Sequence, residues 1–152
     1  MTCYEIVNNT LVETQDRFEN AVICVCSPDE LRSQNPKLAP HTIDECSCPG
    51  PAKLEAYDGY DFILLNVIQN EIQYETLRMG LYIMQHQIIF VCDHSSEMLQ
   101  GVLKAFLKIQ TSSLTAARVL YAFFNNLTKN DSEELEALEE EISDIEERVL
   151  NG

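Results

Sequence analysis

The sequence predicts an α/β fold: a largely antiparallel central sheet flanked by helices, with a long acidic C-terminal helix. Residues 60–68, 74–84 and 88–92 predict the strands at the centre of this sheet. The first run is apolar at both alternating sets of positions in its middle, which is typical of a strand packed on both faces. The flanking segments show helical periodicity, so they are expected to cover the sheet.

The second predicted strand has the period-two pattern of a strand with one core face. That face carries Leu77, Met79, Leu81 and Ile83, whereas Thr76, Arg78 and Tyr82 occupy the other. Only three residues, 85–87, separate this run from the third, which predicts a tight hairpin. His86 is expected to be a turn residue with a positive φ, which histidine tolerates, rather than a ligand.

The first forty residues predict further strands and one short helix. Residues 3–7 and 11–14 are strand candidates around a turn at Asn8 and Asn9, and residues 21–26 predict a third strand. The segment 27–30, Ser-Pro-Asp-Glu, combines a serine cap, a proline at the first helical position and a glutamate three residues after the cap. A helix is therefore expected to begin there and to end by Asn35-Pro36.

Two covering helices are predicted after residue 94. Ser95 and Ser96 can cap the first, whose apolar stripe consists of Met98, Leu99, Val102, Leu103, Phe106 and Leu107. A polar break at residues 110–113 precedes the second. Its predicted core face consists of Leu114, Ala117, Leu120, Tyr121, Phe124 and Leu127.

The segment 131–150 contains ten acidic residues and a single basic one, Arg148. Apolar residues nevertheless recur there at alternating spacings of three and four: Leu135, Leu138, Ile142, Ile145 and Val149. This spacing predicts a helix with one apolar seam. Because so short and acidic a helix is marginal alone, a partner helix is expected to lie on the seam.

Composition limits the class of protein. The 152 residues are 45% hydrophobic and 23% charged, as in a soluble globular chain. We divide them into an α/β domain, residues 1–110, and a long helical segment, residues 111–152. A net charge of −15 disfavours nucleic acid and anionic lipid as partners and favours cations. No signal peptide or membrane span is recognisable, so this piece is expected to be cytosolic.

Six cysteines without a secretion signal suggest reduced thiols. Two Cys-x-Cys pairs, Cys24 with Cys26 and Cys46 with Cys48, could bind zinc together with His41. Zinc motifs favour wider spacing within each pair, so small buried hydrophobic residues are the favoured interpretation. No tightly bound cofactor is expected.

Cys92, Asp93 and His94 are consecutive, which raises the possibility of a nucleophile beside a base. Adjacent residues at a strand end point to opposite sides, which argues against that pairing. We therefore predict no catalytic site and do not expect an enzyme.

Several segments together resemble the cytoplasmic domain of CorA-type magnesium transporters. They are residues 53–65 (KLEAYDGYDFILL), the hairpin ending in Phe90-Val91, and residues 119–122 (VLYA) followed by the acidic segment. The resemblance covers residues 20–150. The family's Gly-Met-Asn motif does not occur in this sequence, and the cysteines and His41 depart from the family's pattern in residues 38–46.

The resemblance implies the cytoplasmic, ion-sensing domain of an inner- or plasma-membrane transporter of magnesium or another divalent cation. The domain would reach the membrane only through helices that follow this piece. In such proteins Mg2+ binds weakly between the subunits of a homopentamer and biases the pore closed. Aligned from Pro40, the sensing carboxylate is Glu45; aligned back from Lys53, it is Asp44, and both stay candidates.

The alternative is a free-standing acidic protein-interaction module that pairs through its C-terminal heptad seam, without metal or membrane. A thiol-bound zinc protein ranks third. Two apolar runs of about 20 residues beyond Gly152, with Gly-Met-Asn between them, would favour transport, whereas a stop codon there would favour the module.

Overall fold

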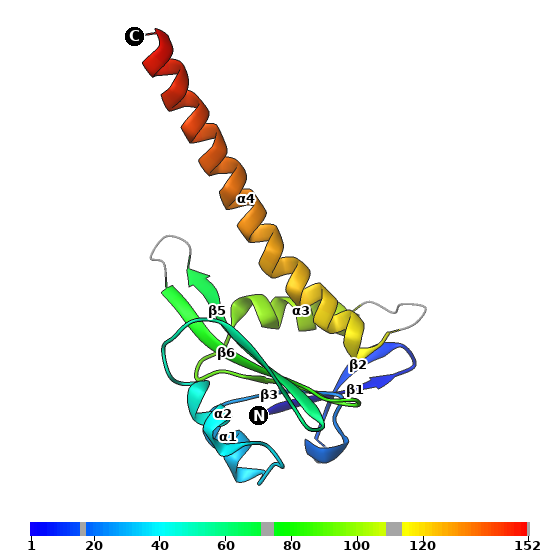
Figure 1. Cartoon of the computed structure of the whole chain (residues 1–152). Coiled ribbons are helices and arrows are strands. Elements are labelled where there is room, and N and C mark those ends of the chain that lie inside the picture. Colours follow the sequence, from blue (N-terminus) through cyan, green and yellow to red (C-terminus); the bar gives the residue numbers. More distant parts are fainter. Residues whose placement is uncertain (16–17, 71–74, 109–113, 152) are drawn as a thin grey trace.

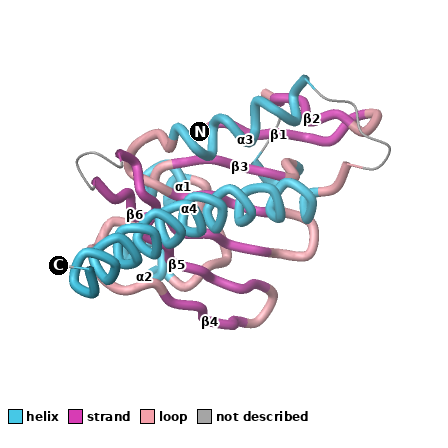
Figure 2. Tube along the Cα trace, turned by 90° about the horizontal axis from the view of Figure 1, so that it is seen from above, coloured by secondary structure: helices cyan, strands magenta, loops and turns pink. Residues whose placement is uncertain are grey.

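The computed structural model describes residues 1–15, 18–70, 75–108 and 114–151. Its sheet has seven strands in the order β2-β1-β3-β7-β6-β5-β4 (Figure 2). The strands are β1 (Thr2–Val7), β2 (Thr10–Thr14), β3 (Ile23–Cys26), β4 (Lys53–Tyr57), β5 (Tyr60–Asn70), β6 (Glu75–Ile83) and β7 (Ile88–Val91). In this sheet β3 and β7 pair in parallel, and all other neighbours pair antiparallel. The predicted α/β fold with a largely antiparallel sheet is confirmed.

The sheet separates two layers of helices (Figure 1). The short helices α1 (Pro28–Ser33) and α2 (Pro40–Glu45) lie on one face, and a 3-10 turn, η1 (Phe18–Asn20), leads into β3. The helices α3 (Glu97–Lys108) and α4 (Ala116–Asn151) lie on the other face, and α4 then extends away from the sheet.

Each face of the sheet has its own core. Beneath α3 and α4, the sheet residues Met79, Leu81 and Phe90 pack with Leu99, Leu103 and Phe123. Beneath α1 and α2, the sheet residues Phe62, Leu64 and Tyr82 pack with Leu31, Ile43 and Cys46. Tyr82, which the period-two pattern placed opposite the core face, is therefore fully buried, because α2 covers that face as well.

Local signals in the sequence form the predicted turns and caps. Asn8 and Asn9 have φ angles of 51° and 60°, the left-handed pair that a two-residue hairpin requires. Ser27 Oγ accepts a hydrogen bond from the backbone N–H of Glu30, and α1 starts at Pro28 as predicted. Ser96 Oγ likewise accepts from the backbone N–H of Leu99 at the start of α3.

The expected positive φ of His86 in the β6–β7 connection is wrong. In the described part of the chain, positive φ angles occur at Asn8, Asn9, Asn35 and Gly59, and His86 is not among them. The β6–β7 connection is instead closed by the backbone N–H of Met84, which donates to the carbonyl of Gln87, so the chain reverses without a left-handed residue. His86 lies at a bend within the connection between the two strands, as the hairpin prediction required.

The predicted core face of α4 is rotated from the observed one. Val119 and Phe123 are fully buried, whereas Ala117 is exposed and Tyr121 is 73% exposed. Leu114 is buried but precedes the helix, which starts at Ala116, so a helical periodicity counted from Leu114 has the wrong phase. The alternation of apolar residues also predicted three strands in the central region of the chain. The sheet contains a fourth strand from that region, β4, at its edge.

Five of the six cysteines are buried, namely Cys3, Cys24, Cys26, Cys46 and Cys92, so their interpretation as small hydrophobic residues is confirmed. Cys48 is exposed, and for it that interpretation is wrong. It lies just beyond α2, where its thiol donates to the carbonyl of Asp44 and packs against no core.

The proposed division at residues 110 and 111 stays a prediction, although the first turns of α4 pack into the core of the sheet through Val119 and Phe123. No helix in the described ranges is long and apolar enough to cross a membrane.

Gly80 allows α2 to lie close to β6, and its replacement tests that contact. A Cβ at Gly80 would overlap Cys46 Sγ and lie 3.3 Å from the Phe62 ring. Gly80→Ala should lower the free energy of unfolding by about 1–3 kcal/mol, measured by urea denaturation. Gly101→Ala in α3, where a Cβ meets nothing within 4 Å, should instead raise it by about 0.5–1 kcal/mol. Unchanged stability in Gly80→Ala would contradict this close packing.

Candidate metal-binding site

The helix α2, which carries both candidate carboxylates, is fixed to the sheet by polar and apolar contacts. Ile43 and Thr42 are buried, and the Thr42 hydroxyl donates to the carbonyl of Ala39 at 2.6 Å. Since that donation uses its only proton, the hydroxyl of Tyr82, at 2.9 Å, must donate to Thr42. The backbone N–H of Ala39 donates to the Tyr60 hydroxyl at 2.9 Å. Strands β5 and β6 therefore set the position of α2.

Because its buried residues face the sheet, α2 presents Asp44 outward, whereas Glu45 is only partly exposed. The Asp44 side chain is 67% exposed and turns toward α1. There Asp44 Oδ1 accepts a hydrogen bond from Arg32 Nη2 at 2.7 Å, while Arg32 Nη1 donates to Asp29 Oδ1, also at 2.7 Å. One guanidinium thus links the carboxylates of α1 and α2.

Glu45 turns the other way, toward the edge strand β4. Its carboxylate pairs with Lys53 Nζ at 2.5 Å, and the same ammonium pairs with Glu55. The Tyr57 hydroxyl donates to the second oxygen of Glu55. Because Tyr57 has no further proton to donate, His41 Nε2, 3.0 Å away, must be the donor to its oxygen.

These contacts shift the proton affinities of the partners. The hydrogen bond to Asp44 raises the pKa of Arg32, and those to Glu45 and Glu55 raise the pKa of Lys53. Lys53, followed by Tyr57, lowers the pKa of Glu55, and the bond to Glu55 raises the pKa of Tyr57 to about 12. At neutral pH, Arg32 and Lys53 are therefore cations beside the two candidate carboxylates.

The structure places Asp44 and Glu45 on one exposed helix but directs them to different partners. Within the ranges described, no three His, Cys, Asp or Glu side chains are arranged to hold a metal ion. The residues of the zinc hypothesis are separated, since Cys46 packs against Gly80, Cys48 is exposed and His41 bonds to Tyr57. Sequence reasoning missed Arg32 and Lys53, the basic partners of the carboxylates.

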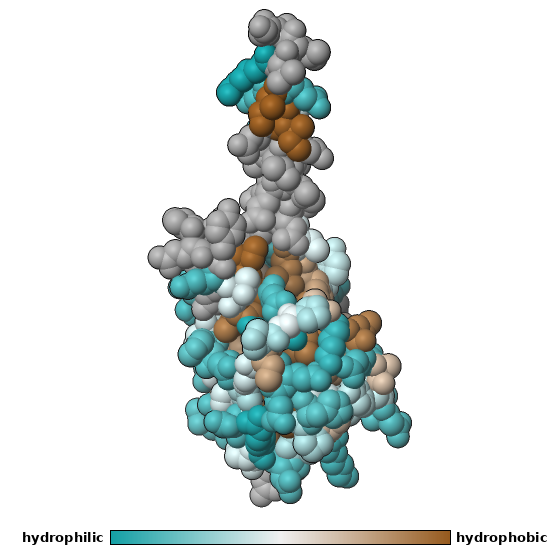
Figure 3. All heavy atoms as spheres, turned by 60° about the vertical axis from the view of Figure 1, so that its left-hand side comes forward, coloured by the Kyte–Doolittle hydropathy of each residue, from teal (hydrophilic) through white to brown (hydrophobic). Residues whose placement is uncertain are grey.

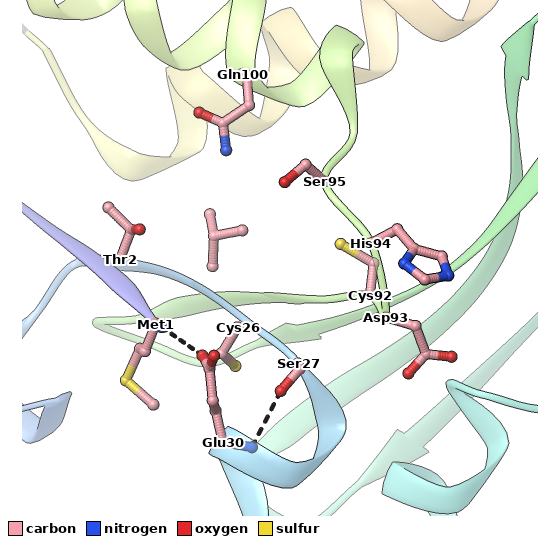
Figure 4. Close-up of a pocket in the computed structure, with 11 residues that line it drawn as sticks. Met1, Thr2, Cys26, Ser27, Glu30, Cys92, Asp93, His94, Ser95 and Gln100 are labelled. Atoms are coloured by element: carbon pink, nitrogen blue, oxygen red, sulfur yellow. Dashed lines mark hydrogen bonds and ion pairs between the residues drawn. The ribbon is translucent and has the colours of Figure 1, made fainter.

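A cavity of about 190 Å³ lies at the carboxyl ends of the parallel strands β3 and β7 (Figure 4). Cys92 lines it, and Figure 4 shows its sulfur and the His94 ring on different sides of the backbone. Burial, and secondarily Asp93, raise the pKa of the Cys92 thiol to about 11, so the thiol is not ionised at neutral pH. This arrangement gives no support to a nucleophile and base at Cys92 and His94.

Comparisons with known proteins identify the fold. Residues 32–152 match the family model described as CorA-like Mg2+ transporter protein. No curated protein gave a match. The solved cytoplasmic domain of ZntB from Vibrio parahaemolyticus is similar, with a TM-score of 0.69 and 14% identity over 92% of this chain and 62% of that chain.

Two further solved structures share the fold. Full-length CmaX has a TM-score of 0.73 and 10% identity, over 97% of this chain and 50% of that chain. The soluble domain of CorA from Methanocaldococcus jannaschii has a TM-score of 0.64 and 16% identity, over 99% of this chain and 64% of that chain. The chain spans between half and two-thirds of the length of these proteins. On the match over residues 32–152, the chain belongs to the CorA-like Mg2+ transporter protein family.

Proposed function

We propose that this chain is the cytoplasmic, ion-sensing domain of a CorA-like transporter of magnesium or another divalent cation. The single observation that carries this function is the family match over residues 32–152. The same match favours this function over a free-standing interaction module. The proposed location is the cytoplasmic side of an inner or plasma membrane, with attachment through helices beyond residue 152.

The sensing element is the outward face of α2. Its carboxylates belong to an acidic surface on which Asp29, Asp44, Glu45 and Glu55 surround Arg32 and Lys53. Hard divalent cations prefer such oxygen ligands. The Arg32–Asp44 pair is exposed, and exposed ion pairs stabilise a protein little, so a divalent cation can displace Arg32 from Asp44 at small cost. The Lys53 pairs are only partly exposed.

Magnesium normally keeps several waters and takes only one or two carboxylates from protein. Asp44 or Glu45 would supply one ligand, and a neighbouring copy in a homo-oligomer, a pentamer by family resemblance, would supply the other. The ion then offsets the repulsion between domains that each carry a net charge of −15. Holding the acidic domains together in this way biases the pore closed.

The distal part of α4 also fits an assembled protein. Ile142 and Ile145 are 49% and 53% exposed, and apolar atoms lie on this part of α4 (Figure 3). The structure does not describe the side chains of Leu135, Leu138 and Val149. The full seam therefore stays a prediction. Its partner would be a helix from the rest of the protein or from a neighbouring subunit.

The seam is tested by Ile142→Asp combined with Ile145→Asp. Burying two carboxylates is unfavourable, so the double variant should self-associate less or lose helix content, while the sheet stays folded. Sedimentation velocity and far-UV circular dichroism measure both. Ser143→Asp, which adds a charge beside the seam, should change neither. If the double variant matches the parent in both measurements, Ile142 and Ile145 form no seam between copies of this chain.

The chain studied alone should bind Mg2+ weakly, because the ligand from a neighbour is missing. Titration calorimetry in about 20 mM NaCl should detect weak binding that fades in about 300 mM NaCl, since salt screens the attraction to the acidic surface. A tight site of one Mg2+ per chain that withstands the higher salt would contradict a site completed between subunits.

In the protein with its membrane region, replacing both Asp44 and Glu45 with Ala should raise the Mg2+ concentration that closes the pore. Ion flux, or protection from proteolysis, measures that concentration. A matched variant replaces the exposed acidic residues Glu13 and Glu97 with Ala, removing the same charge elsewhere on the domain, and should close near the parental concentration. An equal shift in both variants would assign the effect to overall charge, and no shift in either would remove the pair from the mechanism.

A further inference from the structure

Two buried thiols from different strands contact each other in the core beneath α1 and α2. Cys3 of β1 and Cys24 of β3 are direct partners in the antiparallel register. The Cys24 thiol donates to Cys3 Sγ, and the two sulfur atoms are 3.3 Å apart. Neither cysteine forms a disulfide, and both lie in the core beneath α1 and α2. They play no part in the candidate ion site.

We propose that Cys3 and Cys24 are a thiol-oxidation site, at which a low-molecular-weight disulfide such as oxidised glutathione forms a cross-strand disulfide between β1 and β3. Directly opposed residues in antiparallel strands have Cα atoms about 4.5 or 5.5 Å apart, and disulfides span Cα distances of about 4.4–6.8 Å. The register of the two strands therefore already places the Cα atoms of Cys3 and Cys24 at a distance that a disulfide can span. Only the sulfurs must approach, from 3.3 Å to about 2.05 Å.

Within the described chain, the surroundings make this pairing specific. Cys26 shares the face of Cys24, but the register that pairs Thr2 with Val25 places Cys26 beyond the residues opposite β1. Cys46 packs against Gly80, and Cys92 belongs to the core on the other side of the sheet. Cys48 is exposed, so an oxidant reaches it without any opening of the sheet.

The reaction is a balanced exchange. The Cys3 thiolate attacks oxidised glutathione, which forms a mixed disulfide and releases one glutathione. Cys24 then loses its proton and attacks the Cys3 sulfur, which breaks the mixed disulfide and releases the second glutathione. Two protein thiols are oxidised and one glutathione disulfide is reduced to two thiols.

Burial makes the exchange slow and pH-dependent. Cys3 is 6% exposed and Cys24 is fully buried, so the oxidant reaches Cys3 only when the start of β1 opens. Burial, followed by the contact with Cys3, raises the pKa of Cys24, so it is a neutral thiol at neutral pH. The step in which Cys24 loses its proton and closes the disulfide should therefore become faster as the pH rises.

The disulfide would fasten the β1–β2 hairpin, at the edge of the sheet, to β3. This region precedes residue 32, where the match to the family model begins, so oxidation there acts on a part of the chain outside that match. A cross-link between residues 3 and 24 restricts the unfolded chain and should raise the Tm by about 5 °C.

The test uses the whole chain with Cys48→Ala, which removes the exposed thiol. After incubation with oxidised glutathione at about pH 8, the expected product has lost two of its five thiols and contains no bound glutathione. Peptide mapping should find Cys3 joined to Cys24, and dithiothreitol should reverse the rise in Tm. Adding Cys3→Ala or Cys24→Ala should abolish the cross-link, whereas adding Cys26→Ala should preserve it.

The proposal would be overturned by retention of all five thiols, by a disulfide between other cysteines, or by equal thiol loss in Cys24→Ala. Circular dichroism verifies that each variant is folded. If an alanine variant unfolds, Cys3→Val, which fills the same space, replaces it with the same expected loss of the cross-link. A rate that does not rise with pH would contradict attack by a buried thiol.

Discussion

The burial of both faces of the sheet is the constraint on which the rest of this structure depends. Strands β5, β6 and β7 alternate between two cores, so each face needs its own helices. The helix α3 and the start of α4 cover one face, and α1 and α2 cover the other. Because α2 must cover its face of the sheet, it packs against Gly80 and Tyr82. This position determines where its carboxylates point.

The position of α2 on the sheet determines which basic side chains pair with its carboxylates. Asp44 meets Arg32 from α1, and Glu45 meets Lys53 from β4, because the helix lies between those two elements. Both pairs are partly or largely open to water, where ion pairs hold a geometry without adding much stability. Such pairs keep an acidic surface ordered and leave it able to exchange its basic partners for a divalent cation, which suits the proposed sensing role.

The same burial governs the thiols. Desolvation is the first cause of the raised pKa values of Cys26 and Cys46, each to about 12, so these thiols stay neutral inside the core. Cys3 and Cys24 differ from them in having each other as neighbours at 3.3 Å. The Cys24 thiol is not unusually acidic, but its closeness to Cys3 allows a disulfide to form between them. We therefore place the oxidation site at this pair rather than at a single reactive cysteine.

The sequence by itself determined the features that depend on neighbours along the chain. The turn at Asn8 and Asn9 and the caps at Ser27 and Ser96 are short-range interactions, and the central strands follow from side-chain alternation within each strand. The family resemblance, too, came from contiguous motifs such as residues 53–65.

Tertiary structure decided the rest. Which face of α4 is buried depended on where the helix starts after Leu114, and the exposure of Cys48 depended on where α2 ends on the sheet. The partners of Asp44 and Glu45 come from other elements, because the path of the chain between α1, α2 and β4 brings Arg32 and Lys53 beside them. A carboxylate's position can be located in a sequence, but its partner is set by packing, since electrostatic contacts act through space rather than along the chain.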